Sequence, residues 1–505
     1  MRTHARIGLH RSSKVYQPNK VMIWTDTFAN NRQSSIFSTT LGENNARLVE
    51  LNRQDIRVIV GNPPYSVGQD NANDDNQNEN YEELDGRIAA TYAARTEATL
   101  KNSLYDSYIR AYRWASDRIG EKGIIGFVTN AGWIDSNSAD GMRKCLVEEF
   151  STIYVYHLKG NQRTSGERSR QEGGKVFGEG SRAPVAIVFL VKNPEATEQG
   201  KIYYHTVADY LTREEKLAAL KRNVSIAHTQ VNEIVPDAHG DWLNQRDDSY
   251  ARFMRVDGKK ASENSIFKNY SRGVATSRDA WVYGSNKRKV LEHVANSITF
   301  YNSQVKALAA NPNYEIDLDP KKMKWDRLQK NTILRGKIVE DVSVSKLYLS
   351  YYRPFFTQYL YLDRFWNNCV YQMPAIFPTC ESKNLLICSS GVGSKEFSCL
   401  MVNQIPCLDF LEKTQSFPRW LPGEQAKEAE DVLDFGEPNE VPSGFSPEAL
   451  PHFQAAYPGM PMTEDDLFYY IYGILHSEDY RTRYANNLMK ELPRIPRVAT
   501  YEQFM

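Results

Sequence analysis

The chain has 505 residues, of which 41% are hydrophobic and 25% charged, and a mean hydropathy of −0.57, values typical of a globular protein in water. Because one domain usually holds roughly 100 to 200 residues, this length predicts more than one domain. The formal net charge is zero, so total charge gives no argument for a nucleic-acid partner and any basic surface must be local.

The N-terminal segment 1–14 is basic but has no apolar core and no small-residue cleavage site, so no secretory signal is predicted. The longest uncharged apolar stretch, PVAIVFLV at 184–191, is far shorter than the roughly 20 residues of a membrane span. We therefore expect a cytoplasmic protein without a membrane partner.

Short apolar runs alternate with helical stretches in the first part of the chain. Short buried strands separated by helices are typical of a parallel α/β sheet that is covered on both faces. The polar, turn-rich segment 193–201 follows the last of these strands and predicts a domain boundary. The predicted strands are 21–24, 56–61, 123–130, 152–158 and 185–192, and the predicted helices are 103–119 and 142–150.

The second part of the chain is irregular and rich in aromatic residues, with one clear helix predicted over 464–492. This pattern indicates a mixed α+β domain. Residues 69–80, QDNANDDNQNEN, are a loop by composition. Five of the six cysteines fall between 369 and 407, with no C-x-x-C pair and no adjoining histidine at zinc-ligand spacing, so we interpret them as buried thiols and predict no metal site.

The tetrapeptide Asn62-Pro63-Pro64-Tyr65 ends the apolar run RVIVG and is the motif that carries chemistry. The exocyclic amine of adenine is a poor nucleophile because its lone pair is delocalised into the ring. The Asn62 side-chain carbonyl and the Pro63 backbone carbonyl could each accept a hydrogen bond from that amine and localise the lone pair. Two prolines fix the direction of the acceptor, and Tyr65 would stack on a base flipped out of the duplex.

The alternative is that this motif is only a tight turn at the end of a strand, since Asn-Pro and Pro-Pro are common in loops. Proline makes up about 5% of average sequence. The probability that NPPY occurs by chance in a chain of this size is therefore below about one in a hundred. Ligand sites in open α/β sheets also lie at the carboxyl ends of strands, where this motif falls. The functional interpretation is therefore favoured.

The chain resembles the amino-methyltransferases with an NPPY motif and, within them, the Type ISP restriction-modification enzymes, which join nuclease, translocase, methyltransferase and target-recognition parts in one polypeptide. The resemblance spans nearly the whole chain, through GNPPYSVGQ, KNSLYDSYIRAYRWASDRI, GFVTNAGWID, HLKGNQRTSGE, EGGKVFGEGSRAPVAI, NYSRGVATSRDAWVY and YYRPFF. It implies a partial Rossmann-like methyltransferase domain over 1–195 and a mixed α+β target-recognition domain over 196–505.

The resemblance also implies a cofactor, S-adenosylmethionine, and roles for single residues. Asp26 resembles the acid that contacts the cofactor's adenine ring, with Phe28 as a neighbour, although an acid after a strand is also a common turn former. Phe177 resembles the aromatic residue that packs on the flipped base, and the alternative for Phe177 is a small hydrophobic anchor.

Candidate contacts to double-stranded DNA fall in both halves. The glycine- and serine-containing segment 159–182 has six cations against three acids, and a flexible basic loop beside the catalytic edge suits phosphate contact, the alternative being solvated charge. In the second half, arginine and asparagine side chains can form paired hydrogen bonds to the edges of guanine and adenine. The candidates are Lys159, Arg163, Arg168, Arg170, Lys175, Arg182, Arg272, Arg278, Trp281, Arg353, Arg364, Asn367 and Asn368.

Two motifs of the family pattern are missing from the sequence. Neither an F-x-G-x-G turn for the cofactor's methionine portion nor a P-loop is found, and VFGEG and LDFGEP do not have the right spacing. We therefore expect a C-terminal piece of a larger polypeptide that carries an upstream nuclease-helicase portion, and little cofactor affinity for the chain alone. The leading hypothesis is a site-specific DNA adenine-N6 methyltransferase; the alternatives are an NPPY enzyme acting on protein glutamine or RNA, and a non-catalytic specificity fragment.

Overall fold

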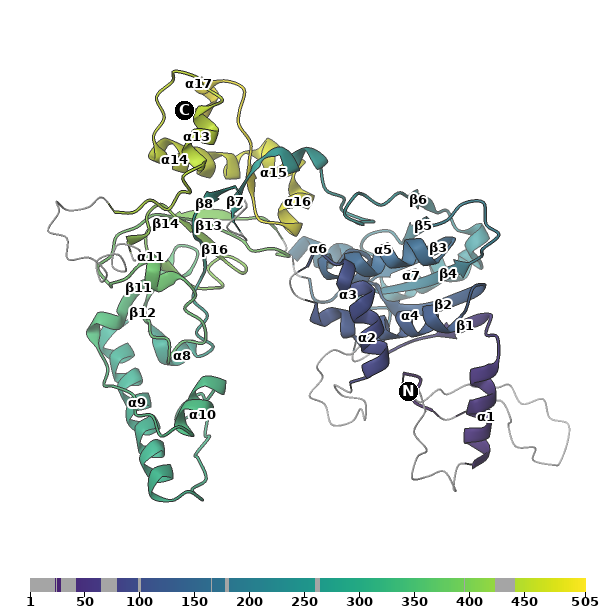
Figure 1. Ribbon diagram of the computed structural model, residues 1–505, viewed down its shortest axis with the longest axis horizontal. Helices are drawn as coiled ribbons and strands as arrows, with labels where there is room; N and C mark the ends of the chain where they lie inside the picture. Colours follow the sequence, from purple (N-terminus) through teal and green to yellow (C-terminus); the bar gives the residue numbers. More distant parts are fainter. Residues whose placement is uncertain are drawn as a thin grey trace. The chain divides into compact units, whose positions relative to one another are not determined.

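The computed structural model describes residues 23, 25–28, 42–64, 80–98, 101–164, 166–177, 181–258, 264–394, 396–422 and 441–505. They form two compact units, Met1–Gln245 and Arg246–Met505 (Figure 1). Tyr65, most of the predicted strand 21–24 and most of the predicted loop 69–80 lie outside the described residues. No helix in the described ranges is long and apolar enough to cross a membrane.

The first unit is built on a single six-stranded sheet whose spatial order differs from the chain order. Four of its strands match predicted ones, and two further strands follow them in the chain. In spatial order the strands are β1 (Val58–Gly61), β2 (Gly123–Asn130), β4 (Val185–Lys192), β3 (Thr152–Lys159), β5 (Lys201–Thr206) and β6 (Asn232–Ile234).

The sheet is mixed, so the prediction of a parallel sheet is wrong for part of it. β1 runs parallel to β2, and β3 runs parallel to β5, but β4 is antiparallel to both β2 and β3. β4 runs in this direction because the chain leaves β3 and returns to β4 at the same edge, through residues 160–184. A helical crossover over the face of the sheet would have made β4 parallel to β3.

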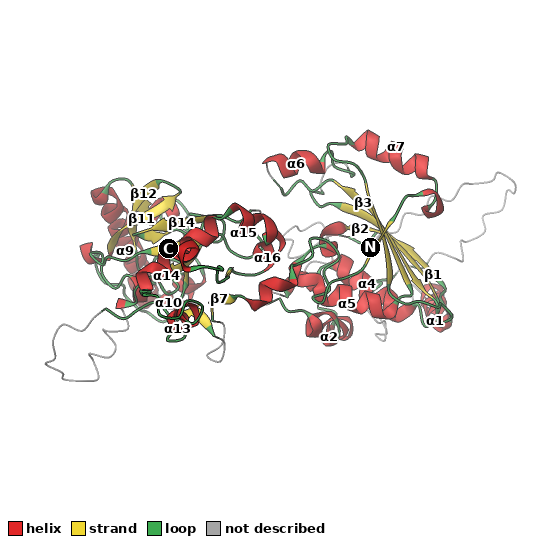
Figure 2. Cartoon of the chain, turned by 90° about the horizontal axis from the view of Figure 1, so that it is seen from above, coloured by secondary structure: helices red, strands yellow, loops and turns green. Residues whose placement is uncertain are grey.

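Helices cover both faces of the sheet (Figure 2). α2, α4 and α5 pack on one face over a core that includes Tyr112, Trp133 and Phe150, and α6 and α7 lie on the other face. Asp106 caps α4 by accepting a hydrogen bond from the Tyr108 amide. The helices of this unit are α1 (Gly42–Arg53), α2 (Glu82–Ala90), α3 (Tyr92–Arg95), α4 (Ser107–Arg118), α5 (Asp140–Glu149), α6 (Gly166–Glu172) and α7 (Arg213–Asn223).

On the second face, the described side chains form a hydrophobic cluster near the carboxyl end of β3. This small cluster is built around Tyr156, Leu158 and Val176. At the other end of the sheet Val58 and Val60 of β1 are 61% and 79% exposed. Helices lie on both faces as predicted, and the described residues leave these two side chains of β1 exposed.

The predicted boundary between residues 195 and 196 falls inside this unit. β5 and β6 come after the boundary and complete the sheet, because β5 pairs with β3 along its length and β6 pairs with β5. The first unit ends at Gln245.

The second unit has three small sheets and is mixed α+β, as predicted. The sheets have the orders β10-β12-β11-β15, β14-β13-β16-β9 and β17-β7-β8. The strands are β7 (Met254–Asp257), β8 (Ser265–Phe267), β9 (Ser271–Arg272), β10 (Tyr283–Gly284), β11 (Leu347–Arg353), β12 (Phe356–Tyr361), β13 (Leu386–Ser389), β14 (Cys399–Val402), β15 (Ile405–Pro406), β16 (Gln415–Pro418) and β17 (Arg494–Ile495).

Helices in the second unit are short apart from α9 and α14. The predicted helix over 464–492 is divided into three, because Ser477 ends α14 and caps α15 by accepting from the Tyr480 amide, and the chain bends again at Tyr484. The helices are α8 (Asp279–Val282), α9 (Lys287–Ala310), α10 (Arg327–Ile333), α11 (Met373–Ile376), α13 (Ala449–Gln454), α14 (Glu464–His476), α15 (Glu478–Arg483), α16 (Ala485–Lys490) and α17 (Tyr501–Phe504).

The cysteines of the second unit mostly follow the prediction of buried thiols. Cys388, Cys399 and Cys407 are buried, and burial raises the pKa of the Cys388 thiol to about 12. Cys369 is half-buried. Cys380 is exposed, so the prediction is wrong for this residue.

Candidate functional site

Several chain segments meet at one edge of the first sheet. β1 and β2 run parallel and end at this edge, at Gly61 and Asn130. The first residue of β4, Val185, lies opposite Asn130 on one side and opposite Lys159, the last residue of β3, on the other. The turn after β1 and both ends of the segment 159–182 therefore lie along the same edge, where ligand sites form in sheets of this kind.

The candidate catalytic turn begins directly after β1. Asn62 and Pro64 are exposed and Pro63 is buried. The exposure of Asn62 leaves its side chain accessible from solvent, while the burial of Pro63 fixes the backbone between the two. The predicted role of Tyr65 lies outside the described residues.

Asp26 and Phe28 lie together with a residue that the sequence did not indicate, Tyr81. The Asp26 carboxylate accepts hydrogen bonds from the Phe28 amide at 3.0 Å and from the Tyr81 hydroxyl at 3.1 Å. The two rings meet edge to face, with centroids 5.5 Å apart. The Tyr81 amide donates to Asp85, which is paired with Arg110 at 2.7 Å. Tyr81 was missed because 54 residues lie between it and Asp26 and no local pattern links the two.

The predicted basic segment contains paired and exposed cations. Lys159 is ion-paired with Asp209, and Arg170 is paired with Glu167 within α6. Arg182 donates to the Gln162 carbonyl at 3.1 Å. The remaining predicted cations are exposed and are Arg163, Arg168 and Lys175.

A buried lysine of α7 holds this segment in place. The Lys216 ammonium group donates to the carbonyls of Glu172 and Gly174, at 2.7 Å each. Burial lowers its pKa to about 8, and the nearby charge of Lys159 acts in the same direction. Lys216 stands in the charged helix sequence REEKLAALKR, and its partners Glu172 and Gly174 are more than 40 residues away, so no local pattern indicates this contact.

Phe177 is half-buried and packs against the cluster around Tyr156, Leu158 and Val176. This contact favours the hydrophobic-anchor alternative for Phe177. Its stacking on a base stays a prediction.

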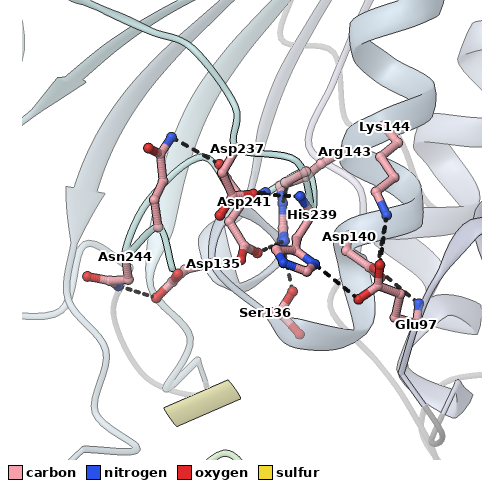
Figure 3. A network of polar contacts seen from close by, with 12 residues as sticks. Glu97, Asp135, Ser136, Asp140, Arg143, Lys144, Asp237, His239, Asp241 and Asn244 are labelled. Atoms are coloured by element: carbon pink, nitrogen blue, oxygen red, sulfur yellow. Dashed lines mark hydrogen bonds and ion pairs between the residues drawn. The ribbon is translucent and has the colours of Figure 1, made fainter. Parts of the chain in front are cut away.

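A polar network centred on Arg143 joins α5 to the end of the first unit (Figure 3). The buried guanidinium pairs with Asp241 at 2.9 Å and donates to the carbonyls of Gly240, Trp133 and Ser136 at 2.8 to 2.9 Å. Burial lowers the pKa of Arg143. Because Trp133 and Ser136 follow β2, this network fixes the residues that leave the sheet at the candidate edge.

Two predicted DNA contacts in the second unit have structural roles instead. The Arg278 guanidinium is buried, pairs with Asp326 at 2.5 Å and donates to Gln329 and to the Trp366 carbonyl. Asn367 is buried and donates to the Tyr361 carbonyl at 3.0 Å. Neither side chain is accessible to a phosphate or a base edge in this conformation, so these two expectations are corrected.

The other predicted residues of the second unit are accessible. Arg272, Arg364 and Asn368 are exposed, while Trp281 and Arg353 are half-buried. The Arg353 guanidinium stacks 4.2 Å from the centre of the Tyr352 ring. The structure also contains a basic pocket of about 370 Å³ that the sequence did not predict, because its cations come from residues that are far apart in the chain. It is lined by Arg252, Phe253, Met254, Arg255, Asn264, Glu448, His452 and Arg494.

Comparison with known families divides the chain in the same way. Residues 6–164 match the Eco57I restriction-modification methylase family, and residues 265–505 match the Type ISP C-terminal specificity domain. No curated protein sequence gives a significant match.

Three solved structures are similar over almost the whole chain. A nuclease-deletion mutant of the Type ISP enzyme LlaGI with a DNA substrate mimic is 36% identical over 98% of this chain, with a TM-score of 0.80. The ATP-dependent Type ISP enzyme LlaBIII bound to DNA is 33% identical over 97% with a TM-score of 0.80, and a DrdV–DNA complex is 35% identical over 97% with a TM-score of 0.80. This chain spans 38%, 31% and 47% of the lengths of those three chains.

The fold and the edge turn thus define a restriction-modification methylase domain followed by a specificity domain. The chain belongs to the Type ISP restriction-modification family.

Proposed function

We propose that the chain forms the base-binding and target-recognition part of a site-specific DNA adenine-N6 methyltransferase in a restriction-modification system. The observation that carries the proposal is the Asn62-Pro63-Pro64 turn at the carboxyl end of β1, on the same sheet edge as the segment 159–182. A base-binding turn and a basic loop along one edge suit a flipped nucleotide that remains attached to its phosphates.

The turn would act on the amino group of adenine. The Asn62 side-chain oxygen and the Pro63 backbone carbonyl each accept a hydrogen bond from one N–H of this amino group. These two hydrogen bonds localise the lone pair of the nitrogen. Pro63 and Pro64 restrict the backbone, so the acceptors are oriented before the base enters. S-adenosylmethionine supplies the electrophilic methyl group when it is bound.

We propose that Asp26, Phe28 and Tyr81 form part of a cofactor site. The Asp26 carboxylate is held by Phe28 and Tyr81 and retains acceptor capacity for cofactor hydroxyl or amino groups, and the two rings offer an apolar wall. The glycine-rich turn for the methionine portion is absent from these 505 residues. We therefore propose that this turn comes from a further polypeptide portion.

The test compares Asn62→Ala with Asn52→Ala, a matched exposed asparagine on α1. Each variant is co-expressed with the upstream portion of its gene, and modified bases in host DNA are mapped. We expect adenine-N6 methylation with wild type and Asn52→Ala and its loss with Asn62→Ala. Methylation that survives Asn62→Ala would contradict the proposed mechanism.

The missing glycine-rich turn favours a second candidate, a DNA-binding specificity fragment without catalysis. Titration calorimetry of the purified chain with S-adenosylmethionine measures whether the isolated chain binds the cofactor as a complete enzyme would. We expect no measurable heat, because half of the cofactor site is missing. A micromolar affinity would show that the 505 residues hold a complete cofactor site. If the enzyme instead methylates protein glutamine or RNA, the same co-expression experiment would find no adenine-N6 methylation in host DNA with wild type, and mass spectrometry of host protein and RNA would find the modification.

A further inference from the structure

The β11–β12 hairpin in the second unit ends in an aromatic tip. Arg353 pairs with Phe356, so the turn between the strands consists of only two residues, Pro354 and Phe355. The Phe355 side chain is 88% exposed, the highest value among the large hydrophobic side chains in the described part of the chain. Phe356 beside it is 49% exposed.

The backbone at this tip is unfavourable for phenylalanine. Phe355 has a φ of +60°, in the left-handed region. A turn with proline first and a positive φ second normally carries glycine or asparagine at the second position, since a Cβ atom is strained there. A bulky residue with this φ is a true outlier and requires an explanation.

Folding of this chain gives no compensation for the strain. An 88% exposed ring gains almost nothing from burial, so neither the turn nor a core accounts for phenylalanine at residue 355. Positions that break a local rule without a gain in stability are expected at functional sites.

The base of the hairpin is held by side-chain contacts and carries a cation. The register shifts between Tyr351 and Arg353, which marks a β-bulge at Tyr352. The Tyr352 hydroxyl donates to Asp279 at 2.9 Å, and the Arg353 guanidinium stacks on the Tyr352 ring and donates to its carbonyl at 2.6 Å. The apolar tip suits contact with stacked bases, and the guanidinium beside it suits contact with a phosphate. Double-stranded DNA offers both groups side by side.

We propose that Phe355 is a wedge that inserts between adjacent bases of double-stranded DNA, with Arg353 beside it at a backbone phosphate. The inference rests on the proposed DNA-binding function and adds to it a residue that distorts the duplex. Inserting a side chain costs unstacking energy, so a step that is already open should be preferred.

The variant Phe355→Gly tests the proposal, because it relieves the backbone strain and removes the ring that would contact the bases. Glycine accepts the left-handed backbone, so the thermal midpoint of the full chain should rise. Affinity for a fluorescein-labelled, mixed-sequence duplex, measured by anisotropy, should fall roughly tenfold because the stacking contact is lost. The dependence of affinity on salt should stay the same, because no phosphate contact is removed.

A second duplex and a control variant sharpen this test. Wild type should bind a duplex with one unpaired base more tightly than the fully paired duplex, and Phe355→Gly should lose this preference. Tyr469→Ala, which removes another exposed aromatic ring of the same unit, should retain it. Wild-type affinity in Phe355→Gly would overturn the wedge alone, and so would a lowered thermal midpoint. Failure of wild type to bind any duplex would overturn the proposed function and the wedge with it.

Discussion

Arginines that the sequence predicts as DNA contacts lie in different surroundings in the two units. In the first unit Arg163 and Arg168 stand exposed on a segment at the edge of the sheet, as expected for phosphate contacts. In the second unit Arg278, in an equally suggestive sequence, lies inside the core with its guanidinium paired to Asp326. Residue type therefore indicates a DNA contact only where the surrounding backbone keeps the side chain at the surface.

The difference arises from long-range partners. The segment 159–182 contains glycines and few apolar residues, and Val176 and Phe177, not Arg163 or Arg168, pack into the cluster around Tyr156. Arg278 is buried because Asp326, Gln329 and the Trp366 carbonyl, all distant in the chain, supply acceptors for it.

Arg143→Met should have the largest effect on stability. It removes the buried partner of Asp241, whose side chain is only 2% exposed, and should lower the free energy of unfolding of the first unit by about 3 to 5 kcal/mol. Urea denaturation followed by the fluorescence of Trp133 and Trp242, which contact each other, would measure it. The double variant Arg143→Met with Asp241→Leu should recover part of the loss; no recovery would mean that the ion pair is not the cause.

Arg278→Met should destabilise the second unit by a smaller amount, about 3 kcal/mol, because its partner Asp326 is partly exposed. Duplex affinity at a temperature where the protein stays folded should be unchanged. The comparison between the two units would break down if Arg278→Met left the unfolding free energy intact and weakened DNA binding.

Arg163→Ala should leave stability within about 0.5 kcal/mol of wild type, because the side chain is exposed. Duplex affinity should fall, and the slope of log affinity against log salt should decrease by about 1, as expected for one lost phosphate contact. Glu167→Ala on the neighbouring helix α6 is a useful counterpart, since it removes an acid and should not reduce affinity. If the salt slope of Arg163→Ala equals that of wild type, Arg163 makes no phosphate contact.

His157→Gln should have the smallest effect, visible only in acid. Burial lowers the pKa of His157 from 6.5 to about 4, with Lys159 and Lys216 acting in the same direction. The unfolded chain therefore binds a proton that the folded chain does not, and stability is lost as the pH falls from about 6.5 to about 4. Denaturation midpoints across this range should fall less steeply in His157→Gln; equal slopes would exclude His157 as the cause.

Local patterns were sufficient for much of the first unit. The apolar runs predicted β1, β2, β3 and β4, because a short apolar run is visible in a single window of sequence. The direction of β4 was not predictable, since it depends on where the segment 160–184 returns to the sheet. The boundary was misplaced because β5 and β6 follow a polar turn that resembles a linker.

The candidate site was predictable to a similar degree. Asn62, Pro63 and Pro64 could be placed at a strand end from their neighbours alone, and the edge registers bring the segment 159–182 to the same place. Tyr81 and Lys216 could not be found, since each acts through a partner that is distant in sequence. Their contacts exist only in the folded chain.

The open end of the first sheet has a consequence for handling this protein. Among the described strands β1 lies at one edge of the sheet, where backbone N–H and C=O groups can pair with a strand from another molecule, and its residues Val58 and Val60 are exposed. At high concentration the purified chain should therefore self-associate through β1. A lysine in place of Val60 would discourage such pairing, and the resulting gain in colloidal stability would make the other measurements practical.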